Sequence, residues 1–264
     1  EEIDLIEEEW LIDIDVQNGF GSDKLNRVGV LTDASDFYDE WDAFEPPLVP
    51  GGVSMRIDNT HWDEANDIYS TDIKSVSEQG HFWDLNVVAQ DEDRNVIVTF
   101  DGISDIPEDF DIFLIDKSIG TAQNLSSRDT YIYPAGRTSN QRDFRLVIGT
   151  REFVEENNAG VSLYPDAFAL SQNFPNPFNP KTTILLSIEN EAVVDLVVYN
   201  LLGETVTTLA QEEYLQPGYY NFIWSGYNEQ GNRVASGLYL YSTIIKSPSG
   251  KVLLNQTRKM IFVK

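Results

Sequence analysis

The sequence predicts an all-β protein built from two consecutive β-sandwich domains, of which the second is immunoglobulin-like with about seven strands. Two observations predict this class. Apolar residues recur mainly with a period of two, and clusters of turn-forming residues separate the short segments that carry this pattern. No segment of helical length keeps a 3.6-residue period. With 264 residues and 41% apolar side chains, the chain can give each domain its own core.

The first half of the chain opens on the clearest strand pattern. In the segment WLIDIDV, residues 10–16, apolar side chains occupy alternate positions and aspartates two of the others, as expected for a strand with one buried face. Further strands are expected at 53–57, 82–88, 96–100, 110–115, 130–133 and 144–148. We therefore predict an acidic β-sandwich domain of about eight strands over residues 1–160.

The second half repeats the pattern more clearly. Strands are expected at 183–188, 193–199, 205–209, 219–224, 237–245, 251–254 and 259–263. About seven short strands with regular turn signals are typical of an immunoglobulin-like sandwich. The sequence therefore predicts such a domain over residues 181–264.

Residues 161–180 are predicted to form a linker rich in proline and asparagine. Residues 173–183 read NFPNPFNPKTT. Each proline fixes its own φ near −65° and favours extended geometry in the residue before it. We expect a semi-rigid segment that enters the second sandwich at a defined angle; an ordinary proline-rich spacer is the alternative.

Residues 168–264 carry an ordered set of landmarks. The segments are FALSQNFPNPFNP, TTILLSI, VVDLVVYNLLGETVTTL, LQPGYYNFIWSGYNEQGNRVASGLYLYS and TRKMIFVK. This order resembles the C-terminal sorting domain of the type IX secretion system, found on exported proteins of Bacteroidetes and related phyla. The motif residues are Asn173, Pro175, Asn176, Pro177, Gly203, Gly218, Trp224, Gly237, Tyr239 and Lys259. More loosely, residues 18–21 and 32–47 resemble β-sandwich modules that precede such tails.

The resemblance implies that this domain is a sorting signal for export and has no chemical activity of its own. In this family the type IX export machinery reads the domain, which is often removed afterwards or replaced by a surface anchor. We therefore expect a secreted protein, located outside the cell or on the outer surface of a Bacteroidetes-like Gram-negative bacterium. The chain begins at Glu1 without a methionine, so we also expect a processed or excised product.

The charge of the chain is unevenly distributed. Residues 1–164 hold 36 acidic and 11 basic residues, a net of −25, whereas residues 165–264 hold 8 and 7, a net of −1. The acidic half would repel nucleic acid phosphates and anionic lipid head groups, so neither is an expected partner. The longest apolar runs are shorter than the roughly 18 residues of a membrane span.

No arrangement of residues indicates catalysis. The chain has no cysteine and no Gly-x-Ser-x-Gly motif, and both histidines, His61 and His81, lie close to a tryptophan in strand-like surroundings. With 44 acidic residues, some pair of carboxylates will always look suitable for hydrolysis, so pairs carry no information. We therefore expect a protein that is not an enzyme.

Two acidic clusters and two tryptophans are the candidate binding residues. The clusters are Asp33, Asp36, Asp39 and Asp42, and Asp58, Asn59, Asp63 and Asp67. Closely spaced oxygen ligands could bind Ca²⁺, with a solvated acidic surface as the alternative. Trp41 and Trp62 lie near acidic residues and could stack against the rings of a polysaccharide, although some aromatic side chains of this region must belong to the core.

The expected function is therefore a non-catalytic structural or adhesive role at the cell surface. A sharper version is a self-assembling subunit of an extracellular fibre. In that version Ile3, Leu5 and Ile6 would add a strand to a neighbouring sandwich, unless they pair within their own domain. The alternative function is the C-terminal accessory, carbohydrate-binding region of a larger secreted hydrolase.

Overall fold

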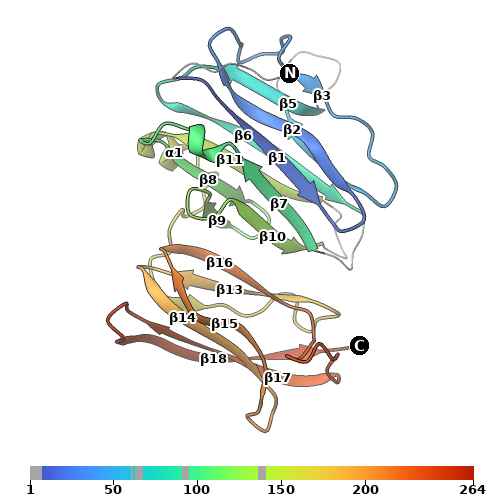
Figure 1. The fold of residues 1–264 in the computed structure, drawn as a ribbon, viewed down its shortest axis with the longest axis vertical. Coiled ribbons are helices and arrows are strands. Elements are labelled where there is room, and N and C mark those ends of the chain that lie inside the picture. The colour runs from blue at the N-terminus through green and yellow to red at the C-terminus, as the bar shows by residue number, and fades with distance from the viewer. Residues whose placement is uncertain (1–7, 61, 63–67, 91–94, 136–140) are drawn as a thin grey trace. The chain divides into compact units, whose positions relative to one another are not determined.

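A computed structural model describes residues 8–60, 62, 68–90, 95–135 and 141–264, and its chain divides into two compact units, Glu1–Leu163 and Tyr164–Lys264. Nearly all regular structure is β, and each unit has its own apolar core (Figure 1). These features confirm the predicted all-β class.

The first unit is one long sheet rolled around a core. Its strands are β1 (Trp10–Gln17), β2 (Ser22–Leu31), β3 (Ala43–Phe44), β4 (Val53–Asp58), β5 (Ile68–Ser75), β6 (Gly80–Ala89), β7 (Asn95–Asp101), β8 (Asp111–Asp116), β9 (Thr121–Asn124), β10 (Thr130–Pro134) and β11 (Gln141–Gly149). Their order is β10-β7-β1-β2-β5-β4-β6-β11-β8-β9, with β3 paired to β5. Strands β2 and β5 run parallel, and the other pairs are antiparallel.

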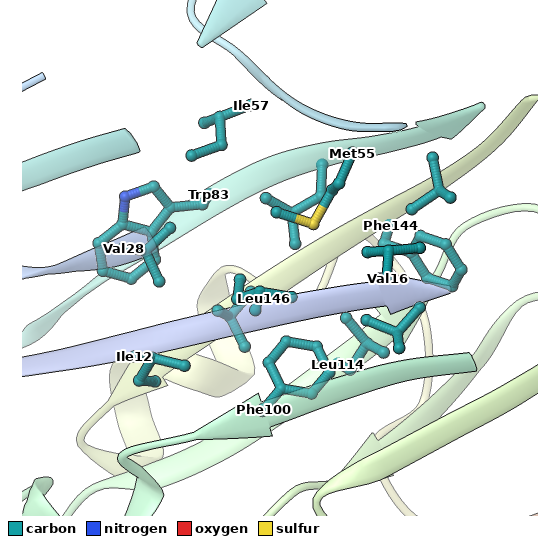
Figure 2. Close-up of a cluster of buried hydrophobic side chains, with 14 of the residues drawn as sticks. Ile12, Val16, Val28, Met55, Ile57, Trp83, Phe100, Leu114, Phe144 and Leu146 are labelled. Atoms are coloured by element: carbon teal, nitrogen blue, oxygen red, sulfur yellow. The ribbon is translucent and has the colours of Figure 1, made fainter. Parts of the chain in front are cut away.

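Side-chain hydrogen bonds connect the two ends of this strand order. Gln123 Nε2, on β9, donates hydrogen bonds to the carbonyls of Arg128 (2.8 Å) and Thr130 (3.1 Å), and Thr130 begins β10. Inside the rolled sheet, side chains from many strands converge on one apolar cluster. Figure 2 shows this cluster around Ile12, Val16, Val28, Met55, Ile57, Trp83, Phe100, Leu114, Phe144 and Leu146.

Strands β2 and β5 were not expected from the sequence. The inner face of β5 carries Asp72 and Lys74, which are 1% and 8% exposed, so polar residues occupy positions where the strand pattern requires apolar ones. The first five residues of β2 include four that are at least partly exposed. Both strands therefore lack the alternation that identifies a strand.

A short helix and the residues after it cover the outer face of β8 and β11. Helix α1 (Arg151–Glu156) begins after Thr150, whose side chain accepts a hydrogen bond from the backbone N–H of Phe153 at 3.3 Å. Val154 and Leu163 join a second apolar cluster with residues of both strands. The helix and the residues up to Leu163 therefore belong to the first unit. The other helical element is a 3₁₀ turn at Ile103–Asp105.

The second unit is a sandwich of two sheets, which confirms the predicted immunoglobulin-like fold. Its strands are β12 (Ala169–Leu170), β13 (Thr182–Ile188), β14 (Ala192–Tyr199), β15 (Thr205–Leu215), β16 (Gly218–Trp224), β17 (Gly237–Lys246) and β18 (Val252–Phe262). One sheet has the order β12-β13-β16 and the other β15-β14-β17-β18. The predicted strands at 251–254 and 259–263 are two ends of β18, and β12 is the seventh strand.

The predicted linker at 161–180 differs from the structure, because most of it belongs to the second sandwich. Leu170 is fully buried, and Phe178 is 2% exposed. The Phe178 ring lies 5.1 Å from that of Phe262 and 5.5 Å from that of Trp224, measured between centroids. The backbone at residues 175–177 and 179–180 is bent and not extended as predicted, and it lies against the sandwich instead of separating two domains.

Candidate functional site

The motif that opens the second unit is fixed by a buried asparagine. The backbone N–H of Asn173 donates to the Tyr241 hydroxyl at 2.9 Å, and its Nδ2 donates to Thr182 Oγ1 at 2.8 Å and to the Pro175 carbonyl at 3.1 Å. The Tyr241 hydroxyl donates in turn to the Ser171 carbonyl at 2.8 Å. We call Asn173, Thr182 and Tyr241 the Asn173 clasp. It ties the motif to β13 and β17.

Between the buried side chains of Asn173 and Phe178, residues 174–177 are exposed. We call these four residues the FPNP turn. The Phe174 side chain is 76% exposed, yet its backbone exchanges two 2.9 Å hydrogen bonds with Thr183. Asn176 Oδ1 accepts the backbone N–H of Ile261 at 2.9 Å. The turn therefore presents an apolar ring to solvent from a fixed backbone.

The other motif residues divide into core and surface positions. Trp224 and Tyr239 are 2% and 8% exposed, with ring centroids 5.1 Å apart, so both fill the sandwich. Gly203 has φ near +80° in the turn after β14, a conformation that favours glycine. Gly218 and Gly237 begin β16 and β17. Lys259 lies exposed on β18, and its carbonyl accepts a hydrogen bond from Gln172 Nε2 at 2.9 Å.

In the first unit, residues 32–42 form a loop, here called the acidic loop, whose aspartates bind backbone N–H groups. Asp39 accepts from the N–H groups of Ser35 (2.7 Å) and Trp41 (2.8 Å). Asp42 accepts from those of Asp39 (2.9 Å) and Ile73 (3.0 Å), which attaches the loop to β5.

Asp36 makes a second attachment of the loop to β5, where it accepts from both the backbone N–H and the hydroxyl of Ser75. These carboxylates act as structural acceptors that shape the loop and hold it against the sheet.

The predicted calcium ligands do not converge in the part of the chain that the structure describes. No group of three or more His, Asp or Glu side chains there is arranged to hold a metal ion. Asp33 is exposed, Asp58 accepts the N–H of Thr60 at 3.1 Å, and Asp36 and Asp39 have the roles given above. Asp63 and Asp67 lie outside the described residues. Calcium binding stays a prediction.

Two carboxyl groups near the acidic loop have raised pKa values. Burial raises the pKa of Asp42 to about 7, although hydrogen bonds from Asp39 and Ile73 oppose the shift. Burial also raises the pKa of Glu45 to about 7, against a hydrogen bond that its carboxylate accepts from the Ser54 hydroxyl at 2.6 Å. Both groups therefore change charge near neutral pH.

The acidic loop also forms one wall of a pocket of about 360 Å³ on the outer face of β1, β2 and β5. Trp41, half-buried, packs against Leu31 and Ile73 beside this pocket. On the sheet, Arg27 Nε and Nη2 donate to the two oxygens of Asp13 at 2.6 and 3.0 Å. The Trp41 pocket thus combines an indole ring with a charged hydrogen-bonding pair.

The structure places the second predicted ligand-binding tryptophan, Trp62, in the core. It is 5% exposed, and its ring lies 4.9 Å from that of Tyr69. Burial removes the face that a sugar would need, because neighbouring side chains already cover it. His81 is half-buried, with Nε2 2.8 Å from the Ser75 carbonyl, and His61 lies outside the described residues.

Sequence reasoning missed a buried ion pair at the end of β8. Asp116 is fully buried and accepts hydrogen bonds from Arg142 Nε at 2.7 Å and the Tyr131 hydroxyl at 2.8 Å. Burial raises the pKa of Tyr131, which keeps its hydroxyl protonated and able to donate. The guanidinium carbon of Arg142 lies 4.4 Å from the Tyr133 ring centroid. The pairing of residues 26 positions apart has no signal in a single sequence.

Among the described residues, no helix has the length and apolar character needed to cross a membrane.

Comparison with known proteins identifies one family within the second unit. Residues 181–246 match the family described as the FlgD Ig-like domain. No curated protein matches the chain. The chain is similar to PorZ of Porphyromonas gingivalis, described as an essential bacterial surface component of the type IX secretion system, at 15% identity and a TM-score of 0.25. It is similar to dimeric latent PorU of the same organism at 12% identity and a TM-score of 0.31.

These likenesses cover 50% and 97% of this chain but only 15% and 30% of PorZ and PorU. A putative β-galactosidase from Bacteroides fragilis is similar at 9% identity and a TM-score of 0.23, over 78% of this chain and 40% of that one. Structural likenesses at these TM-scores carry no argument about function.

Proposed function

We propose that the protein is a non-catalytic secreted protein whose second unit is a type IX sorting domain, and whose first unit has a structural or adhesive role at the surface of a Bacteroidetes-like bacterium. The observation that supports this proposal is the division of the motif residues into buried and exposed positions. Asn173 and Phe178 are buried anchors, and the FPNP turn between them is exposed.

A domain that serves as a sorting signal needs an exposed surface to which the export machinery can bind. An exposed phenylalanine on a fixed backbone supplies apolar contact area at little entropic cost, because the turn is already ordered by hydrogen bonds to β13 and β18. The near-neutral charge of residues 165–264 also leaves this surface free of the strong repulsion expected from the first unit.

Export of the whole chain from a bacterium with an active type IX system tests the proposal. The chain is expressed behind a signal peptide, and its amounts in periplasm, on the cell surface and in medium are compared by immunoblotting. We expect deletion of residues 164–264 to leave the first unit in the periplasm. Phe174→Ser should reduce export several-fold without loss of thermal stability, because its side chain is 76% exposed.

Leu202→Ser is the matched control, since Leu202 is 84% exposed on a different turn of the same unit. It should leave export unchanged. Normal export of the chain without residues 164–264 would refute the sorting role, and equal losses in the two serine variants would refute the specific role of the FPNP turn.

Assembly into an extracellular fibre is a finer form of the proposal. It rests on the apolar side chains of Ile3, Leu5 and Ile6 at the acidic start of the chain, which lie outside the described residues. Electron microscopy of the exported protein, with and without residues 1–8, tests it. Dispersed monomers in both samples would contradict a fibre.

The alternative function, an accessory carbohydrate-binding region of a larger secreted hydrolase, is favoured by the Trp41 pocket. Its volume of about 360 Å³ is within the range of small-ligand sites, and an indole beside a carboxylate and a guanidinium suits a sugar ring. A polysaccharide pull-down with Trp41→Ala tests this function. Val49→Ala, a control at a side chain that is 71% exposed, should bind as the parent does. Equal binding by all three proteins would contradict it.

A further inference from the structure

A lysine, an aspartate and an asparagine meet in the interior of the first unit. Asn59, directly after β4, is 3% exposed, and Asp72 and Lys74 on β5 are 1% and 8% exposed. Lys74 Nζ lies 3.3 Å from Asp72 Oδ2, and Asn59 Nδ2 donates to the same oxygen at 2.9 Å. The amine and the amide therefore share one carboxylate oxygen.

The surroundings of this group are apolar and aromatic. Lys74 Nζ is 5.8 Å from the ring centroids of both Trp62 and Trp83. In the described part of the chain, Asp72 Oδ1 is buried without a hydrogen-bond partner. A buried ion pair with an unsatisfied oxygen is a costly arrangement, since desolvation opposes the attraction between the charges.

We propose that Lys74 and Asn59 form an intramolecular isopeptide bond, with Asp72 as the acid and base for the reaction. Such a bond requires three groups, and all three are present. Lys74 supplies an amine nucleophile, Asn59 supplies an amide carbonyl carbon one bond from Nδ2, and Asp72 supplies a carboxylate that contacts both nitrogens. No cysteine is present to supply a covalent link of another kind.

The steps balance without a further reactant. One proton passes from Nζ to Asp72, which leaves a neutral amine and a neutral acid. The Nζ lone pair attacks Cγ of Asn59 and forms the new C–N bond. Asp72 gives its proton to Nδ2 and takes a second proton from Nζ, the Cγ–Nδ2 bond breaks, and ammonia leaves. Both buried charges are then gone.

The bond would join the end of β4 to the middle of β5 and would close the connection between these strands. Burial of all three side chains would protect the new amide from water. Such a link would suit a surface protein that must resist proteolysis and mechanical load outside the cell.

Mass spectrometry of the intact, purified chain tests the proposal. We expect a mass about 17 Da below that of the sequence, which is the loss of one ammonia, and a protease digest that contains the peptides of Asn59 and Lys74 joined together. Lys74→Met, Asn59→Ala and Asp72→Ala should each show the full mass of their own sequences. Lys246→Met should keep the deficit, because Lys246 forms a similar ion pair with Asp195, to which no asparagine amide of the described residues donates.

The parent protein alone can refute the proposal, whether or not the variants fold. A full sequence mass in folded parent protein would overturn it. A deficit that persists in Lys74→Met would also overturn it, because the ammonia would then come from a succinimide. A loss of about 18 Da with Lys74 joined to Asp72 would overturn it in favour of a different bond.

Discussion

The two units bury different kinds of polar group. In the first unit the described interior contains charged side chains, among them Asp72, Lys74 and Asp116. In the second unit the buried polar side chains are neutral amides and hydroxyls, namely Asn173, Thr182, Ser187 and Thr243. The contrast follows the composition, since residues 1–164 carry a net charge of −25 and residues 165–264 a net charge of −1.

This difference indicates that the two units depend on different forces. A buried charge is tolerated only with a partner, so the first unit should be sensitive to loss of a partner and to pH. A core closed by aromatic packing and neutral hydrogen bonds should respond mainly to lost volume. Each of the following changes should affect one unit and spare the other.

The largest effect is expected from Phe178→Ala in the second unit. Removal of a ring packed against Trp224 and Phe262 leaves a cavity and should cost about 4 kcal/mol of unfolding free energy. Hydrogen exchange resolved by peptide should rise in residues 164–264 alone. Phe174→Ala, at an exposed ring, should change the free energy by less than about 0.5 kcal/mol. An equal effect at both positions would mean that the motif is not anchored as described.

Arg142→Met should have the next largest effect and should act on the first unit. It leaves the Asp116 carboxylate buried without its cation, which should cost about 3 kcal/mol. Urea denaturation followed by tryptophan fluorescence reports this unit, because four of the five tryptophans precede residue 164. Lys24→Met, which removes an exposed ion pair with Asp15, should cost less than about 1 kcal/mol. Equal losses of unfolding free energy in Arg142→Met and Lys24→Met would show that the first unit does not depend on its buried ion pair.

Asn173→Ala should have a smaller effect on the second unit, about 2 kcal/mol. The change removes the two hydrogen bonds donated by Nδ2 to Thr182 and Pro175 in a buried site. Differential scanning calorimetry should show a lower Tm for the second unit only. Asn255→Ala, at an exposed position on β18, is the matched control and should leave the Tm unchanged. An unchanged Tm in Asn173→Ala would show that the clasp adds no stability.

The smallest effect is a pH dependence confined to the first unit. The pKa of Glu45 is raised to about 7 in the folded state, so the folded protein binds a proton more tightly than the unfolded chain. The stability from this group is full below pH of about 4.5 and is lost as pH rises through about 7. Because Glu45 is half exposed, we expect a loss of only about 1 kcal/mol between pH 5 and 8. Asp42 acts in the same direction.

Glu45→Gln should reduce this pH dependence and leave the part that Asp42 contributes, measured as the urea midpoint of the tryptophan transition at several pH values. Two results would contradict a raised pKa of Glu45. One is a stability of the parent that rises between pH 5 and 8, and the other is a pH dependence that Glu45→Gln leaves unchanged.

The second unit could be predicted from sequence in more detail than the first. Its strands alternate clearly, as in AVVDLVVY of β14, and the motif residues Trp224 and Tyr239 both fall within predicted strands. The position of Phe178 could not be predicted, because the composition of a proline-rich segment does not show whether it packs on a sandwich or separates two domains.

In the first unit, β1 was predicted and β5 was missed for one physical reason. Alternation reveals a strand only when its buried positions are apolar, and β5 buries Asp72 and Lys74. Trp41 and Trp62 could not be distinguished in sequence, because both lie in segments rich in aspartate. Only the fold shows that Trp41 borders a pocket and that Trp62 belongs to the core.

The hydrogen bonds of Gln123 have a consequence for the solubility of the protein at high concentration. Unpaired sheet edges are the usual templates on which secreted β proteins aggregate. By tying β9 to the start of β10, Gln123 draws the two terminal strands of the first sheet together and leaves less edge for a foreign strand to join.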